Sequence, residues 1–226
     1  MLELKNVNKK FGSDQVALDN VSLQIKDQEF LFVVGPTGSG KTTLIRLLIR
    51  DILPDSGKII VDQDEVTKKN FSQISQLRRK IGVVFQDFKL LWERTVAENV
   101  ALPLEILGKP AKEIKNKVND LLKKFNLTQL SNKFPVQLSG GELQRVVIAR
   151  AMIANPKILL ADEPTGNLDP ATSWEIVKLL SDINKSGTTV IMATHNVDIV
   201  NSLGKRVVRL EHGKIVKDEK EGRYER

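Results

Sequence analysis

Short apolar runs, separated by polar turn-forming segments, occupy the first third of the chain. Their length and their content of Val, Ile and Phe are typical of β-strands. The predicted strands are residues 2–7, 16–25, 30–34, 58–62 and 81–85. The fourth follows the turn Asp55-Ser56-Gly57, and the fifth ends at Gln86. No apolar run reaches the length that a bilayer-spanning helix needs.

The periodicity changes after Gln86. Up to Pro156, apolar residues recur at helical spacing, with Lys, Asn and Asp on the opposite face. The clearest set is Ile114, Val118, Leu121, Leu122 and Phe125. Strand-like runs return at 158–162, 189–193 and 206–210, and a helix over about 171–184 joins the first two. Strands that alternate with helices predict an α/β core with a mainly parallel sheet, into which the helical stretch is inserted.

Residues 35–42, Gly-Pro-Thr-Gly-Ser-Gly-Lys-Thr, match the phosphate-binding pattern G-x-x-x-x-G-K-[ST] at every fixed position. A predicted strand precedes the segment and a helical pattern follows it, which is the context that this motif requires. The glycines let backbone N–H groups and the helix N-terminus face a phosphate. Lys41 is then placed to reach the β- and γ-phosphates, and the Thr42 hydroxyl to bind Mg²⁺. A glycine-rich turn without a ligand is the alternative, and the flanking strand and helix favour the phosphate site.

Polar residues end three of the predicted strands: Asp162 and Glu163 one, His195 another and Gln86 a third. In open α/β sheets, ligands bind at the carboxyl ends of the strands. We therefore expect Asp162 to hold Mg²⁺ through water, and Glu163 to polarise or deprotonate the water that attacks the γ-phosphate. His195 is expected to contact the γ-phosphate or that water, and the Gln86 amide to reach Mg²⁺ or the water. The alternatives are a turn cap for Asp162, a solvent-exposed Glu163 and a His195 without a role.

The segment from Leu138 to Arg145 predicts the start of a helix. Ser139 is a suitable N-cap, and Glu142 is the N3 residue of a capping box. A well-capped helix explains the segment by itself, but exposed glycines at a helix N-terminus also form a phosphate site. Because one nucleotide does not need two γ-phosphate sites in one chain, this second site is expected to serve the nucleotide held by another subunit.

Composition limits the remaining classes of protein. The 226 residues contain no cysteine and two histidines, which excludes disulfides and thiolate metal sites and leaves little scope for a histidine metal centre. The N-terminus lacks the basic and apolar regions of a signal peptide, so none is expected. The net charge is +7, but the basic residues are interleaved with acids and only 5% of residues are aromatic. A solvated surface, or contact with an anionic membrane leaflet, explains this charge, and nucleic acid is not expected as a partner.

Together these motifs resemble the ATP-binding cassette (ABC) ATPases over essentially the full length of the chain. In the family's terms, 35–42 is Walker A, Gln86 the Q-loop, 158–163 Walker B, 166–169 with Asp169 the D-loop, and His195 the H-loop. The implied ATP-binding residues are Phe11, Gly35, Pro36, Thr37, Gly38, Ser39, Gly40, Lys41, Thr42 and Thr43, where Phe11 stacks on adenine or is simply a core residue. The implied signature residues, which act on the opposite subunit, are Ser139, Gly140, Gly141 and Glu142. Many family members have Gln in place of Glu142.

The resemblance implies a single ABC nucleotide-binding domain over residues 1–226. A P-loop NTPase (RecA-like) core, with a mainly parallel sheet and an N-terminal antiparallel β subdomain, would comprise 1–87 and 156–226, and an inserted α-helical signature subdomain 88–155. The implied activity is hydrolysis of ATP to ADP and phosphate by a homodimer that forms in the ATP-bound state, with ATP and Mg²⁺ as cofactors. The implied catalytic residues are Glu163, His195 and Gln86, and the implied Mg²⁺ ligands, partly through water, are Thr42, Gln86 and Asp162.

Within the family, residues 162–169 (Asp-Glu-Pro-Thr-Gly-Asn-Leu-Asp) are similar to the branch of lipoprotein-release, macrolide-export and FtsE-type cell-division ATPases. Residues 84–91 and 95–100 look most like the FtsE type. That resemblance implies an FtsX-like integral membrane partner, a peripheral location at the cytoplasmic face of the plasma (inner) membrane, and regulation of septal cell-wall hydrolysis. The ATPase of a lipoprotein or macrolide-type exporter is the alternative. A soluble ABC protein acting on nucleic acid or ribosomes usually has two cassettes or a long coiled-coil insertion, and this sequence shows neither.

Overall fold

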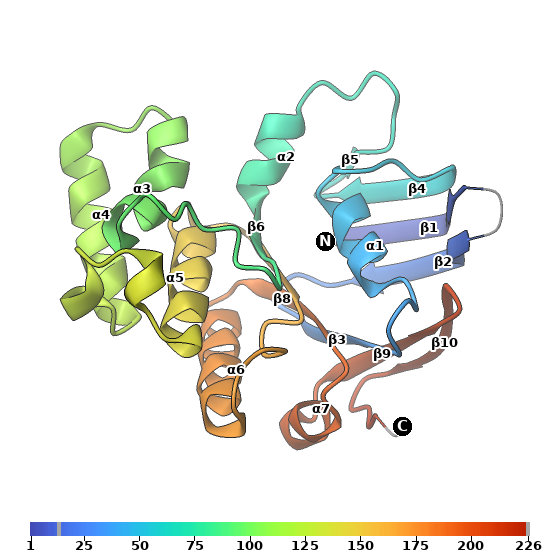
Figure 1. The fold of residues 1–226 in the computed structure, drawn as a ribbon. Coiled ribbons are helices and arrows are strands. Elements are labelled where there is room, and N and C mark those ends of the chain that lie inside the picture. Colours follow the sequence, from blue (N-terminus) through green and yellow to red (C-terminus); the bar gives the residue numbers. More distant parts are fainter. Residues whose placement is uncertain (13–14, 225–226) are drawn as a thin grey trace.

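The computed structural model describes residues 1–12 and 15–224, and their strands form two sheets (Figure 1). The smaller sheet has the order β2-β1-β4-β5, and each neighbouring pair is antiparallel. Its strands are β1 (Leu2–Phe11), β2 (Gln15–Ile25), β4 (Ser56–Val61) and β5 (Asp64–Glu65). This sheet is the antiparallel β part expected from the family resemblance.

The larger sheet has the order β10-β9-β3-β8-β7-β6. Its strands are β3 (Phe30–Val34), β6 (Ile81–Val84), β7 (Ile158–Asp162), β8 (Thr189–Thr194), β9 (Arg206–Glu211) and β10 (Lys214–Glu219). All neighbouring pairs are parallel except β9 and β10, which form an antiparallel hairpin at one edge. The predicted fold class, an α/β protein with a mainly parallel sheet, is confirmed.

The central strands of the larger sheet are buried along their length and largely apolar, because both of their faces are covered. Side chains alternate between the two faces of a strand. In β3, Phe32 and Val34 therefore belong to one core cluster, and Leu31 and Val33 belong to the other. This two-sided burial explains why the sequence shows continuous apolar runs here rather than an alternation of apolar and polar residues.

Seven α-helices lie in the described part of the chain. They are α1 (Lys41–Leu48), α2 (Ile74–Lys80), α3 (Val96–Ile106), α4 (Ala111–Lys124), α5 (Gly140–Met152), α6 (Pro170–Lys185) and α7 (Val197–Leu203). Helices α3, α4 and α5 pack together as a helical lobe at one side of the molecule (Figure 1). Helix α5 also contacts β6 and α6, so it joins the lobe to the parallel sheet.

Some elements differ from the sequence-based expectation. The strands β1 and β2 are longer than predicted, and β5, β10, α2 and α7 were not predicted. Strand β10 is mostly exposed and rich in Lys, Asp and Glu, because it lies at an edge of the sheet and pairs only with β9. No helix in residues 1–12 and 15–224 is long and apolar enough to cross a bilayer. The division of the chain at residues 87/88 and 155/156 stays a prediction.

Candidate functional site

Three neighbouring strands end at the same level, and this register assembles the site. Val34, the last residue of β3, lies beside Thr194, the last residue of β8. Asp162, the last residue of β7, lies beside Ala193 of β8. The residues that follow the three strands are Gly35, His195 and Glu163. The phosphate loop (35–42), the histidine and the acid therefore leave the sheet at one edge, as the strand pattern predicted.

The phosphate loop turns directly into helix α1. Gly40 is the N-cap of α1 and has a φ of 108°, and a Cβ atom there would lie 2.3 Å from the carbonyl oxygen of Ala17. Glycine is therefore required at this position for its conformation and for its size. Lys41 is buried, and its Nζ donates hydrogen bonds to the carbonyl oxygens of Gly35 at 2.8 Å and Pro36 at 3.1 Å. These bonds hold the ammonium group against the loop, beside the N–H groups that begin α1.

Two oppositely charged groups are buried next to each other below this loop. Burial lowers the pKa of Lys41, and the negative charges of Glu163 and Asp162 oppose that change. Burial raises the pKa of Asp162, and the Thr42 side chain and the charge of Lys41 oppose it. One carboxylate oxygen of Asp162, Oδ1, is buried without a hydrogen-bond partner. An unpaired buried carboxylate oxygen is costly, and a bound cation or the water molecules around it would remove this cost.

Glu163 projects from a strained turn. Its φ is 47°, a left-handed conformation that non-glycine residues seldom adopt and that often occurs at functional sites. The turn is held by two backbone hydrogen bonds, from the Glu163 N–H to the Ala193 carbonyl at 2.9 Å and from the Gly166 N–H to the Glu163 carbonyl at 3.1 Å. The Oε1 atom of Glu163 lies 3.0 Å from His195 Nδ1 and 3.8 Å from Lys41 Nζ. The carboxylate is therefore fixed between an imidazole and an ammonium group.

A cavity of about 300 Å³ lies over the phosphate loop. The predicted site residues that line it are Phe11, Thr37, Gly38, Gly40, Lys41, Thr42, Thr43, Gln86, Glu163 and His195. Phe11 is partly exposed at the end of β1, and its ring also lies 5.6 Å from Lys9 Nζ. Gly35, Pro36 and Ser39 do not line this cavity, although they belong to the same loop.

The sequence reasoning missed three residues of this cavity, Gln15, Val16 and Ala17 at the start of β2. The feature that marks this segment is the exposure of an apolar side chain, since Val16 is 39% exposed. Exposure is a property of the fold, so the sequence carried no signal for these residues.

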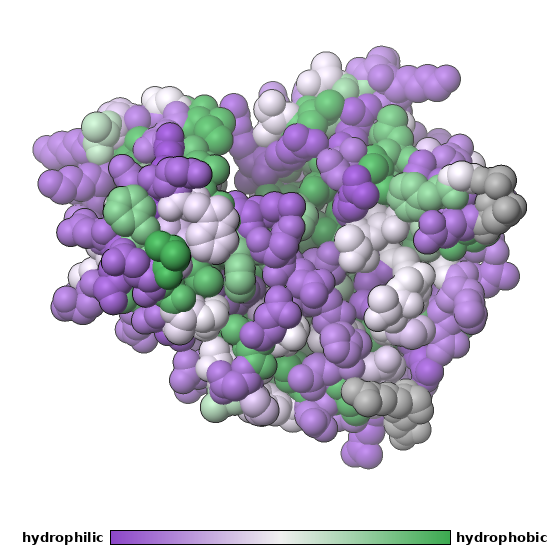
Figure 2. Space-filling view, in the orientation of Figure 1, coloured by the Kyte–Doolittle hydropathy of each residue, from purple (hydrophilic) through white to green (hydrophobic). Residues whose placement is uncertain are grey.

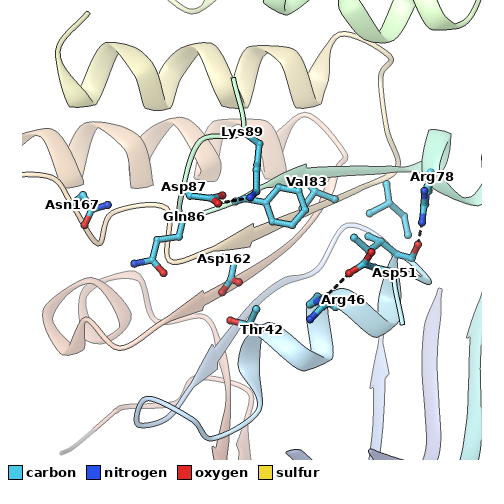
Figure 3. A pocket seen from close by; sticks show the side chains of 13 residues that line it. Thr42, Arg46, Asp51, Arg78, Val83, Gln86, Asp87, Lys89, Asp162 and Asn167 are labelled. Atoms are coloured by element: carbon cyan, nitrogen blue, oxygen red, sulfur yellow. Dashed lines mark hydrogen bonds and ion pairs between the residues drawn. The ribbon is translucent and has the colours of Figure 1, made fainter. Parts of the chain in front are cut away.

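Gln86 lies between this cavity and a second, open groove. The groove is lined by residues from α1, α2, β6 and the segment after β6, including Thr42, Asp162 and Gln86 (Figure 3). In the close-up, the side chains of Thr42, Asp162 and Gln86 lie around one space at the carboxyl end of the sheet (Figure 3). Gln86 and Thr42 are thus the predicted site residues that line both hollows.

The signature segment (139–142) begins helix α5, and its predicted capping box is present. The Ser139 hydroxyl accepts a hydrogen bond from the Glu142 N–H at 3.4 Å. Glu142 Oε2 accepts hydrogen bonds from the Ser139 N–H and from the Ser139 hydroxyl, both at 2.8 Å. These bonds, the backbone one above all, lower the pKa of Glu142. The Glu142 carboxylate therefore fixes the hydroxyl of Ser139.

The signature segment packs closely against the beginning of α6. A Cβ atom on Gly141 would lie 2.4 Å from Thr172 Cγ2, which is closer than real Cβ contacts allow. Thr172 in turn donates its N–H to the Asp169 carboxylate, the N-cap of α6, at 3.0 Å. The starts of α5 and α6 therefore form one close-packed unit.

The predicted site residues fall into two groups. Neither Ser139, Gly140, Gly141, Glu142 nor Asp169 lines the cavity over the phosphate loop or the adjoining groove. Within one chain, then, the signature segment does not reach the site that is built on Lys41 and Glu163.

Comparison with known proteins places this chain in a family. The family model described as "ABC transporter" matches residues 18–166, which is more than half of the chain and includes the phosphate loop, Gln86, the signature segment and Glu163. The chain belongs to the ABC transporter family. Its similarity to the cell division ATP-binding protein FtsE of Bacillus subtilis (strain 168) is 49% identity, covering 99% of this chain and 98% of that protein. For FtsE of Mycobacterium tuberculosis (strain H37Rv) the identity is 48%, over 99% of this chain and 98% of that protein.

A solved structure supports the same assignment. The ATP-binding cassette MJ0796, in a dimeric post-hydrolysis state bound to ADP and Pi, aligns with a TM-score of 0.89 and 37% identity, covering 99% of this chain and all of that chain. This ABC protein is therefore an ATPase that binds ATP.

The packing of Gly141 against Thr172 gives a stability prediction. Gly141→Ala should lower the free energy of unfolding by about 1–3 kcal/mol, because the new methyl group overpacks the contact between α5 and α6. Thr172→Ser removes the opposing methyl group and keeps the hydroxyl, so the double variant should recover most of the loss. Urea denaturation measures both effects.

Gly140→Ala is the matched control for this experiment. Its Cβ would lie 3.2 Å from the end of the flexible Leu168 side chain and at an ordinary contact distance, 3.9 Å, from the Asn167 carbonyl oxygen, so the loss should be smaller. An unrelieved loss in the Gly141→Ala/Thr172→Ser variant would contradict the packing described here.

Proposed function

We propose that this ABC ATPase is the ATP-hydrolysing subunit of an FtsEX-like complex. In that complex, ATP-driven closure of a dimer would act on a membrane partner that regulates septal cell-wall hydrolysis in cell division. The observation that carries the chemical part is the Glu163 carboxylate, held between Lys41 and His195 beside a cavity formed by the phosphate loop. The similarity to FtsE proteins over almost the whole of both chains supports the biological part.

Each charged group near the phosphate loop has a role in the proposed hydrolysis. Lys41 and the N–H groups that begin α1 bind the β- and γ-phosphates and stabilise the charge that develops there. Glu163 accepts the proton of the attacking water, and His195, bonded to the same carboxylate, orients it. Phe11, which lines the same cavity, stacks on the adenine, a contact that would accept guanine as well.

The donor atoms near Asp162 suit a magnesium ion. Mg²⁺ prefers oxygen ligands and usually keeps water molecules and substrate phosphates in its shell. Thr42, Asp162 and the Gln86 amide offer such oxygens around one space (Figure 3). Within residues 1–12 and 15–224, no three His, Cys, Asp or Glu side chains gather as a metal site, so phosphate oxygens and water have to complete the shell. When bound, the ion would neutralise charge on the β- and γ-phosphates.

The separation of the signature segment from Lys41 supports a homodimer in the ATP-bound state. Helix N-termini attract anions, and α5 begins with Ser139 and two glycines that bring little bulk to the surface. In the proposed dimer, Ser139, Gly140, Gly141 and Glu142 of one subunit face the γ-phosphate bound by the other, and Asp169 lies at the same interface. ATP then lies between the phosphate loop of one subunit and the signature segment of the other.

The groove beside Gln86 is the proposed contact for an FtsX-like integral membrane protein. It adjoins the segment from Gln86 to Asn99, which carries the exposed apolar residues Leu91 and Trp92. The space-filling view shows a hollow between the helical lobe and the part that carries α2, with hydrophobic residues at its bottom (Figure 2). Docking there would place the ATPase peripherally at the cytoplasmic face of the plasma (inner) membrane, and the partner's movement would reach Gln86 directly.

If Glu163 is the general base, Glu163→Gln should lower ATP turnover by about 100-fold or more. ATP binding should be retained, and the ATP-bound dimer should persist because its nucleotide is not consumed. Phosphate release and light scattering measure the two properties. Glu113→Gln, on the exposed side of α4, is the control and should turn over ATP normally. Unchanged turnover in Glu163→Gln would remove Glu163 from the proposed role.

Ser139→Arg tests the shared site. The arginine is too bulky and too extended for a surface that approaches a bound phosphate, so the variant should stay monomeric in the presence of ATP. Binding of a fluorescent ATP analogue to the monomer should change little, because Ser139 lies outside the cavity. Ser72→Arg, at an exposed position before α2, should dimerise as the parent does. ATP-dependent dimers of the Ser139→Arg protein would contradict the shared site.

The partner is tested by affinity capture of tagged Glu163→Gln protein from its own solubilised membranes with Mg-ATP, followed by mass spectrometry. The proposal predicts retention of an FtsX-like protein, and loss of that protein when Trp92→Glu alters the exposed apolar segment beside the groove. Recovery of an exporter subunit instead would contradict the division role and leave the ATPase chemistry intact. Recovery of no membrane protein would contradict the proposed location.

A further inference from the structure

A guanidinium group of the signature helix holds the chain segment that follows Gln86. Arg150, near the C-terminal end of α5, donates two hydrogen bonds to consecutive backbone carbonyls. Its Nη2 bonds the Phe88 oxygen at 2.9 Å, and its Nη1 bonds the Lys89 oxygen at 2.7 Å. The planar, forked guanidinium makes two such bonds in a fixed geometry, which an ammonium group on a flexible stem does not.

The bonded segment has an unfavourable backbone conformation. Phe88 and Lys89 have φ values of 59° and 51°, so two successive non-glycine residues are left-handed. Such conformations persist only where the surroundings impose them. Within the segment itself, the Lys89 N–H bonds the Asp87 carbonyl at 2.6 Å and the Phe88 N–H bonds the Phe85 carbonyl at 3.3 Å. The two bonds from Arg150 come from outside the segment and connect it to helix α5.

The guanidinium of Arg150 bonds these two carbonyls and is not paired with an acid among the described residues. In the described part of the chain, no carboxylate forms an ion pair with Arg150, although several other arginines are paired with acids. Partial burial lowers the pKa of the guanidinium, and the segment's carbonyl oxygens are the acceptors that offset its lost hydration. Moving α5 away from the segment would break both charge-assisted hydrogen bonds, so the contact resists separation.

We propose that Arg150 is a positioning residue that makes Gln86 follow the signature helix. Gln86 lies two residues before the first bonded carbonyl, and Ser139 to Glu142 begin the same helix that carries Arg150. A shift of the signature segment is thereby passed along helix α5 to Gln86, which lines the cavity and also the groove. The inference rests on the proposed function of Gln86 and of the signature segment, and it adds the contact that joins them.

Arg150→Lys keeps the charge and nearly the length of the side chain but loses the fork. We expect kcat for ATP to fall by about 10-fold or more, because the Gln86 amide is no longer held at its working distance. The KM for ATP should change by less than about threefold, since the phosphate loop is untouched. Hydrogen exchange of the peptide that covers 85–91 should speed up, while exchange in 35–48 stays unchanged.

Arg50→Lys is the matched control, because Arg50 also donates to two backbone carbonyls, those of Val66 at 2.7 Å and Lys68 at 3.2 Å. It should leave kcat and the exchange of 85–91 unchanged. Arg150→Met repeats the test with an apolar stem, and a thermal unfolding midpoint for each variant identifies any general loss of folding. Faster exchange over the whole chain in both Arg150 variants would mean a structural role and would overturn the proposal.

A double-mutant cycle with Gln86→Ala separates this proposal from the proposed function. If Arg150 acts through Gln86, Arg150→Lys should lower kcat little further in the Gln86→Ala background. Losses that multiply would overturn the coupling. If Gln86→Ala alone turns over ATP normally, the proposed role of Gln86 fails. In that case, hydrogen exchange of residues 85–91 in Arg150→Lys decides whether Arg150 holds the segment. Unchanged exchange there would overturn the positioning role of Arg150 as well.

Discussion

The parallel register of β3, β8 and β7 is the constraint on which the rest of the site depends. Because Val34, Thr194 and Asp162 end their strands at neighbouring positions, the phosphate loop, His195 and Glu163 start from one edge without any further adjustment. A shift of one residue in β7 would turn Asp162 to the opposite face of the sheet and break the pairing of Lys41 with two carboxylates. The two-sided apolar core around these strands fixes the register and therefore the chemistry.

The buried charges at the carboxyl end of the parallel sheet favour a ligand that combines an anionic group with a cation. Burial disfavours the charged form of Lys41 and of Asp162. The charges of Glu163 and Asp162 only partly compensate Lys41, whereas the charge of Glu163 adds to the cost of ionising Asp162. A nucleotide phosphate group beside Lys41 and a cation beside Asp162 would compensate both at once. The unpartnered Oδ1 atom of Asp162 and the left-handed turn at Glu163 are therefore features of a binding site rather than of a well-satisfied core.

The sequence predicted those parts of the structure that rest on strong local signals. Strands β3 and β7 match their predicted bounds because each is a short apolar run with a clear end, at Gly35 after β3 and at Asp162 within β7. The capping box at Ser139 follows from residue types at fixed spacing, and it is present. Strand β10 could not be predicted, since a polar edge strand is stabilised by its partner and not by its own pattern. The hydrogen bonds from Arg150 to Phe88 and Lys89 join positions 62 and 61 residues apart, and no local pattern encodes such a contact.

The central claim is that a second copy of the chain completes the ATP site, and subunit complementation tests it most directly. A Lys41→Ala chain has an intact signature segment but a defective phosphate loop, and a Ser139→Arg chain has the opposite defect. ATP hydrolysis is measured for each variant alone and for an equimolar mixture. The account predicts that the mixture hydrolyses ATP although neither variant does, because one mixed dimer contains one complete site. A mixture as inactive as its components would contradict the shared site.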